Sequence, residues 1–296
     1  MPETDAEIFD GLVIDWFADH ARDLPWRRPG FSAWGTLVSE FMLQQTPVVR
    51  VIPRLEEWLT RWPTPAALAA EPAGEAVRAW QSLGYPRRAL WLHACAVAIT
   101  ERYDGVVPND VEALRSLPGI GDYTARAVAV FAYGGRHPVV DTNIRRVIAR
   151  AVDGLPDAPA PSARRDLAAM DALLPADVEA STRFNAGMME LGALVCTARS
   201  PKCELCPLAA ADACAWRSAG YPSTEVPRKP KQKKYEGSDR QARGALLALL
   251  RATPHPVPAP HLAQAVTDPA QYGRALTGLL ADGLIIALDD DLFALP

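Results

Sequence analysis

Leu-Pro-Gly-Ile-Gly-Asp-Tyr-Thr-Ala, residues 117–125, is the stretch that decides the fold of this chain. The glycines on either side of Ile120 permit a tight turn with positive backbone angles, and a helix is predicted to begin near Tyr123. The N–H groups at the start of such a helix attract an anion. We therefore expect Gly119 and Gly121 to form a hairpin that binds a DNA phosphate, rather than an ordinary turn between helices.

The bulk composition is that of an ordinary globular protein. The chain has 296 residues, 49% of them hydrophobic, and no apolar run long enough to cross a membrane. Its acidic N-terminus lacks the order of a signal peptide, so we expect a cytoplasmic protein whose DNA substrate would lie in the nucleoid. Nothing requires oligomerisation, and a monomer is expected. The net charge of −4 excludes a surface coated with Lys and Arg, so DNA contacts must rest on a local basic surface and on backbone amides.

Helical periodicity dominates as far as residue 220, with stops at proline and glycine and hardly any alternating strand pattern. This pattern predicts an all-α architecture. Thr46 is expected to cap a helix that starts at Pro47 and runs toward Leu59. Residues 221–238 are rich in proline and lysine and are interpreted as a basic linker; an arm that contacts phosphates is the alternative.

Residues 239–296 are predicted to form a small winged-helix-like unit of three helices and a terminal hairpin. The helices are expected near 240–251, 261–266 and 271–281, and the strands at 284–288 and 292–295. The third helix offers only Arg274 for DNA, and the hairpin carries an acidic turn. We therefore expect packing or partner binding in preference to binding in a DNA groove.

Two carboxylates stand in settings that suit catalysis. Asp141 follows an apolar run and precedes a helical pattern, so its neighbours alone favour a helix cap. Glu40 has mostly apolar neighbours, and desolvation there is expected to raise its pKa, as a general acid at neutral pH requires. The alternative for Glu40 is the polar face of an amphipathic helix.

Four of the five cysteines lie within nineteen residues, with the spacing C-x6-C-x2-C-x7-C. They are Cys196, Cys203, Cys206 and Cys214. Because thiolates are soft ligands and the chain has no export signal, this spacing indicates an iron-sulfur or zinc site before it indicates disulfides. Cys95 is interpreted as a small buried apolar residue.

Residues 114–133 and 139–146 resemble the helix-hairpin-helix DNA glycosylases that carry an iron-sulfur cluster, and residues 38–46 (VSEFMLQQT) resemble the signature of the MutY-type adenine glycosylases. The resemblance implies a two-domain all-α fold with a cleft for an adenine flipped out of double-stranded DNA. The implied parts are a helical domain at 27–134, an iron-sulfur cluster domain at 1–26 plus 135–220, the linker at 221–238 and the unit at 239–296.

The resemblance also implies roles for single residues. Glu40 would protonate adenine at N7 and later orient the attacking water, while the Asp141 carboxylate would face the sugar and stabilise the oxocarbenium ion. Tyr123 stands where bifunctional relatives place a nucleophilic lysine, which implies base removal without strand cleavage. Tyr123 and Asn143 would position Asp141 and the sugar, with packing as the alternative for each.

Further resemblances concern the DNA and the cofactor. Leu43, Gln45 and Tyr85 match positions that fill and probe the helix around the extruded base, with core packing as the alternative for Leu43 and Tyr85. The four cysteines would hold a 4Fe-4S cluster, and a small insertion near residues 209–211, expected to lie in a loop, lengthens their last gap.

These inferences predict a monofunctional DNA repair glycosylase that removes adenine opposite 8-oxoguanine or guanine. The alternatives are a thymine glycosylase for T:G mismatches, an endonuclease III-like glycosylase and lyase, and a DNA-binding protein without activity. The usual C-terminal Nudix-like domain of the MutY type is missing from residues 239–296. Deleting the chain from about residue 238 is therefore expected to leave the preference for 8-oxoguanine over guanine nearly unchanged.

Overall fold

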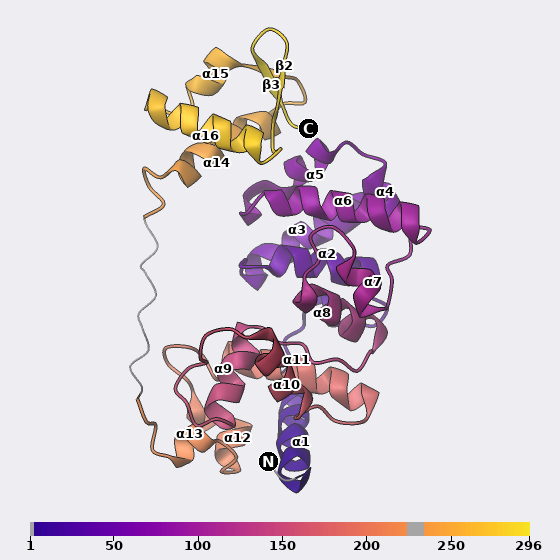
Figure 1. Cartoon of the computed structure of the whole chain (residues 1–296), viewed down its shortest axis with the longest axis vertical. Coiled ribbons are helices and arrows are strands. Elements are labelled where there is room, and N and C mark those ends of the chain that lie inside the picture. The colour runs from indigo at the N-terminus through magenta and orange to yellow at the C-terminus, as the bar shows by residue number, and fades with distance from the viewer. Residues whose placement is uncertain (1–2, 224–233) are drawn as a thin grey trace. The chain divides into compact units, whose positions relative to one another are not determined.

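A computed structural model describes residues 3–223 and 234–296 (Figure 1). The basic run at 228–234 therefore lies outside the described residues, except for Lys234. The chain divides into two compact units, the first from Met1–Phe31, Asn109–Glu112 and Gly121–Arg228 and the second from Ser32–Pro108, Ala113–Ile120 and Lys229–Pro296. Within the described ranges, no helix combines the length and the apolar character that crossing a membrane requires.

The first unit is built on the packing of its first helix against a helix late in the chain. Phe9 of α1 (Glu3–His20) meets Phe184 of α11 (Val178–Leu194) edge to face, with ring centroids 6.3 Å apart. A Cβ atom on Gly187 would lie 2.8 Å from Cγ1 of Val13, so glycine permits the close approach of the two helices. The remaining elements are α8 (Asp122–Tyr133), α9 (Thr142–Ala151), α10 (Ala163–Asp171), η1 (Pro25–Arg27), η3 (Cys203–Leu205), α12 (Pro207–Ala210) and α13 (Ala215–Ser218).

A buried cluster of ion pairs attaches the segment that follows α1 to the helix α11. The Glu190 side chain is 1% exposed and forms two-pronged hydrogen bonds with Arg22, at 2.7 and 2.7 Å, and with Arg27, at 3.1 and 3.0 Å. Burial alone would raise the pKa of the Glu190 carboxyl, but the hydrogen bonds from the two arginines outweigh it and lower the pKa to about 2. Glu190 is therefore ionised at neutral pH.

The helices of the second unit surround a tryptophan core. Trp58 meets Trp62 and Trp80 edge to face, with centroids 4.6 and 5.8 Å apart, and Trp34 donates to the carbonyl of Trp62 at 3.0 Å. The elements are α2 (Ala33–Leu43), α3 (Val48–Arg61), α4 (Pro65–Ala69), α5 (Ala73–Trp80), η2 (Gln81–Leu83) and α6 (Arg87–Arg102), while the residues of α7 (Val111–Arg115) divide between the two units.

The predicted cap at Thr46 is wrong. Pro47 is the N-cap of α3 and Val48 its first residue. The Thr46 hydroxyl donates instead to the carbonyl of Leu83 at 3.1 Å and accepts from Arg88 at 3.0 Å. Contacts with residues distant in the chain therefore use the hydroxyl group that local preference would have assigned to the helix cap.

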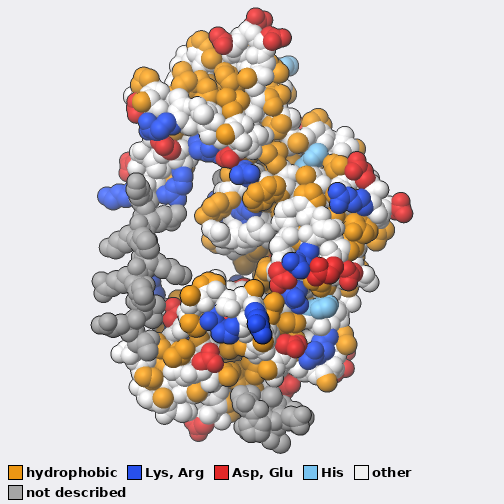
Figure 2. All heavy atoms as spheres, in the orientation of Figure 1, with side chains coloured by type: hydrophobic (Ala, Val, Ile, Leu, Met, Phe, Trp, Pro, Cys, Tyr) orange, Lys and Arg blue, Asp and Glu red, His pale blue; other side chains and the backbone are white. Residues whose placement is uncertain are grey.

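The C-terminal part of the second unit contains the predicted three helices and hairpin. Helix α14 packs against α16, and a three-stranded antiparallel sheet in the order β1-β3-β2 completes this domain. The elements are α14 (Asp239–Ala252), β1 (Val257–Pro258), α15 (Ala259–Ala263), α16 (Pro269–Ala281), β2 (Ile286–Leu288) and β3 (Leu292–Ala294). The sequence did not predict β1. Acidic side chains mark the tip of the hairpin at residues 289–291 (Figure 2). The predicted all-α class is confirmed, with little strand outside this domain.

Candidate functional site

The glycine hairpin has only one left-handed glycine. Gly119 has φ +76°, and a Cβ atom there would lie 2.6 Å from the Cβ of Trp91 and 3.0 Å from the ring of Phe41. Gly121 has φ −92°, so the expectation of two positive angles is wrong. Gly121 is instead the N-cap of α8 and, as a glycine, brings no side chain to the cap. Backbone N–H groups at the start of a helix suit an anion.

Asp141 is the N-cap of α9, as its neighbours indicated. Its Oδ1 accepts the backbone N–H groups of Asn143 at 2.9 Å and Ile144 at 2.8 Å, and its Oδ2 accepts the Asn143 side-chain amide at 2.7 Å. Burial raises the pKa of the Asp141 carboxyl above its ordinary value, and the hydrogen bonds from Ile144 and Asn143 oppose the rise. The carboxylate is thereby held in one orientation.

Asn143 connects this carboxylate to the cysteine-rich segment. Its side-chain oxygen accepts from Arg146 at 2.8 Å, and Arg146 also donates to the carbonyls of Gly192 and Cys196, both at 2.7 Å. Gly192 leaves the space that this requires, because a Cβ atom there would lie 2.7 Å from the Cβ of Asn143. The orientation of Asp141 is therefore coupled to the segment that begins at Cys196.

Tyr123 packs inside the first unit. Its half-buried ring lies against Ala127, Val130 and Val139, together with Phe131. The position carries a phenol at the start of α8, so it offers no amine to a sugar.

Glu40 lies in the second unit, on the helix α2. Only 7% of the residue is exposed, and the residues around it on α2 from Trp34 to Met42 are all buried. The burial that its apolar neighbours predicted is therefore confirmed. Ser32 caps the start of α2 by accepting from the N–H of Gly35 at 3.0 Å.

Two residues expected to probe DNA have strained backbones. Gln45 has φ +56° and Tyr85 has φ +47°, a region that residues with a Cβ atom rarely adopt. Gln45 is exposed and Tyr85 is 54% exposed, whereas Leu43 is half-buried at the end of α2. Exposed side chains on a strained backbone are common where a protein binds a ligand. Pro86, which follows Tyr85, is the N-cap of α6.

Arg88 joins the two strained loops, and no feature of the sequence pattern had marked it as functional. The residue is 3% exposed, and burial lowers the pKa of its guanidinium to about 10. It donates to the carbonyls of Phe41, Met42, Gln44, Leu83 and Gly84 and to the Thr46 hydroxyl, over 2.6–3.4 Å. These acceptors lie on both sides of Gln45 on one loop and just before Tyr85 on the other. The buried guanidinium of Arg88 therefore fixes the backbone positions of both loops.

The four clustered cysteines pack against the core of the first unit. Cys206 is buried and the others are half-buried. Arg150 donates to the sulfur of Cys196 at 3.4 Å and to the carbonyls of Thr197 and Ala198. The insertion expected in a loop at 209–211 is largely a helical turn, because α12 extends to Ala210, and Asp212 then turns the chain with φ +55°. Cys95 is buried elsewhere, as predicted, and burial raises its pKa to about 12.

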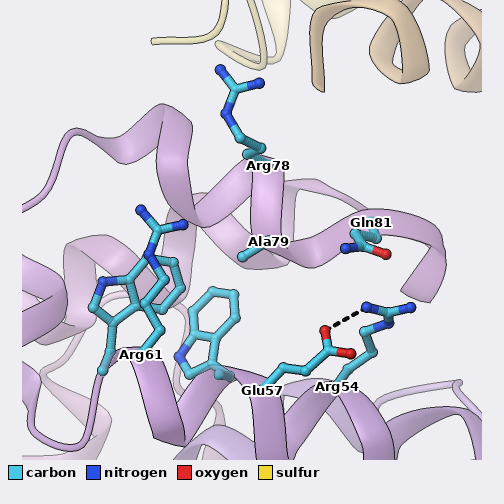
Figure 3. A pocket seen from close by; sticks show the side chains of 8 residues that line it. Arg54, Glu57, Arg61, Arg78, Ala79 and Gln81 are labelled. Carbon is cyan, nitrogen blue, oxygen red and sulfur yellow. Dashed lines mark hydrogen bonds and ion pairs between the residues drawn. The ribbon is translucent and has the colours of Figure 1, made fainter. Parts of the chain in front are cut away.

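A pocket of about 280 Å³ lies between α3 and α5 in the second unit (Figure 3). Its walls include Arg54, Arg61 and Arg78. Each arginine lies beside a carboxylate, Arg54 beside Glu57 at 2.5 Å and Arg61 and Arg78 beside Glu75 at 2.7 and 2.9 Å. The pocket therefore has little excess charge to attract an anion.

Comparison with known proteins places the chain in a family. Residues 38–168 match the HhH-GPD superfamily of base excision DNA repair proteins, and residues 196–210 match the iron-sulfur binding domain of endonuclease III. The chain is 57% identical over 285 residues to an adenine DNA glycosylase of Mycolicibacterium smegmatis, covering 96% of this chain and 94% of the relative. It is 54% identical over 290 residues to that of Mycobacterium tuberculosis, covering 98% and 94%. The chain belongs to the adenine DNA glycosylases.

This adenine DNA glycosylase shares its fold with a glycosylase that is named for a different base. A thermostable thymine-DNA glycosylase superposes with a TM-score of 0.65 at 26% identity, covering 73% of this chain and 98% of the other. The resemblance to the MutY type stated from the sequence is confirmed by the family match, and the two-domain glycosylase fold by the structural one.

This adenine DNA glycosylase carries a 4Fe-4S cluster, and its cysteines fit one. The iron-sulfur match covers Cys196, Cys203 and Cys206. Among the described residues no three metal-binding side chains converge on a single ion, whereas a cuboidal cluster takes one thiolate on each of four irons. Without a cation, burial raises the pKa of the Cys206 thiol to about 11, so iron would be needed to hold it as a thiolate.

Proposed function

We propose that this adenine DNA glycosylase hydrolyses the N-glycosidic bond of adenine opposite 8-oxoguanine or guanine in duplex DNA, and stops at the abasic site. The observation that carries the proposal is the Asp141 carboxylate, buried and oriented by three hydrogen bonds at the start of α9. The names of its relatives and the signature around Glu40 support adenine as the base.

Asp141 is assigned to the sugar. A fixed carboxylate stabilises the positive charge that develops on the sugar as the base leaves, and it costs no reorganisation at that moment. Its Oδ1 accepts two backbone N–H groups of α9, whereas Oδ2 accepts the side-chain amide of Asn143. We assign Oδ2 to face the sugar, and Asn143 to position it.

Glu40 is assigned to the base. A carboxylic acid in an apolar helix keeps its proton more readily than one in water, so it can deliver the proton to N7 of adenine. Protonation turns adenine into a leaving group. The same carboxylate, once ionised, can orient the attacking water. Glu40 belongs to the second unit and Asp141 to the first.

Tyr123 limits the reaction to hydrolysis. A lyase needs an amine that forms an imine with the sugar, and Tyr123 supplies a phenol at the start of α8. The half-buried phenol packs in the core of its unit and is assigned to shape the sugar site.

Leu43, Gln45 and Tyr85 are assigned to the gap that the flipped adenine leaves. An enzyme that extrudes a base must stabilise the opened stack, and side chains inserted into the gap do so. The start of α8 at Gly121 would hold a phosphate through its backbone N–H groups. When bound to Cys196, Cys203, Cys206 and Cys214, the cluster would supply cross-links that hold the segment carrying the exposed Arg199 and Lys202.

A panel of duplexes tests the proposal. The purified protein is incubated under single-turnover conditions with DNA containing A:8-oxoguanine, A:G, T:G or an oxidised pyrimidine. We expect adenine release from the first two. Glu40→Gln should lower the rate at least about a hundredfold, since a positioned general acid contributes that much. Glu56→Gln, on the exposed face of α3, is the matched control and should keep the rate. Preferred release of thymine would show that the chain shares the specificity of its structural neighbour.

A further inference from the structure

Helices α5 and α14 each carry an arginine that donates hydrogen bonds to carbonyl groups at the C-terminal end of the other helix. Arg78 of α5 donates to the carbonyls of Leu250, Arg251 and Thr253 at 3.1, 2.6 and 2.8 Å. Arg251 of α14 donates in return to the carbonyls of Val77 at 2.9 Å and Gln81 at 2.7 Å. The last carbonyls of a helix lack partners within it, so each arginine caps the other helix. In Figure 3, Arg78 points away from the pocket toward the C-terminal helix.

A second contact joins the C-terminal domain to the start of α6. Asp282, which follows α16, pairs with Arg87 at 3.4 Å and with Arg243 of α14. The Arg87 guanidinium also lies over the ring of Trp91, 5.3 Å from its centroid. Asp282 therefore connects the core of the C-terminal domain to the first residue of α6.

These two contacts bracket the loop that carries Tyr85. Arg251 binds Gln81, four residues before Tyr85, and Asp282 binds Arg87, two residues after it. Between them the backbone is left-handed at Gln81 with φ +43°, at Gly84 with φ +82° and at Tyr85 with φ +47°. Such angles persist only where the surroundings hold them.

The C-terminal domain itself is poorly suited to contact DNA. Arg274 of α16 pairs with Asp239 at 3.1 Å, and the tip of the hairpin is acidic (Figure 2). Arg251 is committed to α5, and burial lowers the pKa of its guanidinium to about 10. These features favour an effect of this domain on DNA that passes through the residues it holds.

We propose that the C-terminal domain is a clasp that sets the position of the Tyr85 loop, and through it the reading of the base opposite the adenine. Arg251 and Asp282 are its positioning residues, and neither touches DNA. This inference rests on the proposed function, in which Tyr85 fills the gap. It reverses the expectation from the sequence that deleting the domain leaves the preference for 8-oxoguanine unchanged.

Four variants of the full-length protein with its cluster separate the clasp from general stability. Arg251→Met removes the bond to Gln81, and Asp282→Asn removes the charge that pairs with Arg87. Arg274→Met is the matched control, because it breaks the ion pair with Asp239 inside the C-terminal domain and leaves both clasp contacts in place. Arg251→Lys keeps the charge but not the two-armed geometry, so an intermediate result is expected.

Two measurements are made on each variant. The first is hydrogen exchange of the backbone amides in residues 82–88, which should be about tenfold faster in Arg251→Met, because a charge-assisted bond holding the loop is lost. The second is single-turnover adenine release from A:8-oxoguanine and A:G, where the first rate should fall selectively. Arg274→Met should change neither quantity beyond its effect on the unfolding temperature.

Each outcome of these measurements tests a different part of the proposal. Unchanged exchange at residues 82–88 in a folded Arg251→Met variant would overturn the clasp. Faster exchange with an unchanged ratio of the two rates would overturn its role in reading the opposite base. Failure of the wild-type protein to release adenine would overturn the proposed function alone, since the exchange measurement needs no substrate.

Discussion

The side-chain amide of Asn143 donates to Oδ2 of Asp141 at 2.7 Å, while the backbone N–H of the same asparagine donates to Oδ1 at 2.9 Å. One residue therefore binds both oxygens of the carboxylate and leaves it a single orientation. The cap that starts α9 and the charge proposed for catalysis are the same group. Sequence patterns that favour a helix cap do not argue against a catalytic aspartate here.

This shared role makes Asp141→Asn an informative variant. Asparagine caps helices about as well as aspartate, so the free energy of unfolding should change by less than about 1 kcal/mol. The rate of adenine release should fall at least about a hundredfold, because the charge that stabilises the oxocarbenium ion is gone. Asp177→Asn is the matched control, since Asp177 caps α11 through the N–H of Ala180 at 2.7 Å. Equal rates in the two variants would assign Asp141 to the helix alone.

The identity of Tyr123 predicts the product. Duplex DNA treated with the enzyme should contain an abasic site that breaks only after alkali. Borohydride added during turnover should capture almost no enzyme on the DNA, because no imine forms. Gel electrophoresis with and without alkali measures both. Efficient covalent capture would mean that another amine attacks the sugar.

The two hairpin glycines should respond differently to alanine. Gly119→Ala places a Cβ atom 2.6 Å from that of Trp91 on a backbone with φ +76°, so we expect a loss of stability of about 1–3 kcal/mol. Gly121→Ala meets nothing within 4 Å at φ −92° and should be nearly neutral for stability. Urea unfolding of both variants is the measurement. Equal losses would contradict the turn geometry.

Glu190 should make the fold sensitive to acid. Its pKa is about 2 in the folded protein, below its ordinary value of 4.5, so its stabilising contribution is complete above pH 4.5 and is lost as the pH falls toward 2. A shift of this size corresponds to about 3 kcal/mol. Glu190→Gln should lower the unfolding temperature at neutral pH and flatten its decline between pH 4.5 and 2. Asp23→Asn, which breaks an exposed pair with Arg28, should leave that decline unchanged.

The sequence predicted the structural roles of those residues whose partners lie nearby in the chain. The glycine hairpin, the cap at Asp141, the burial of Glu40 and the spacing of the cysteines are all legible within about ten residues. The sequence did not reveal the roles of Arg78 and Arg88, because their partners are distant. Arg88 holds carbonyls more than forty residues earlier, and Arg78 and Thr253 are 175 positions apart. An arginine in a helical pattern looks like a solvated surface until its acceptors are known.

The same limit explains the smaller errors. Thr46 has the composition of a helix cap, but Arg88 and Leu83 use its hydroxyl. Gly121 looked like a second left-handed residue because glycine permits that angle without requiring it. Strand β1 contains two residues, one of them a proline, and exists because it pairs with β3.

The packing of α1 against α11 has a consequence for synthesis on the ribosome. The apolar face of α1, with Phe9 and Val13, emerges first, but Phe184 and Gly187 follow only after some 170 further residues. At roughly 5–20 residues per second, that face waits on the order of ten seconds or more for its partner. The nascent chain must therefore keep this helix away from other apolar surfaces, and the four clustered cysteines, which follow α11, are synthesised later still.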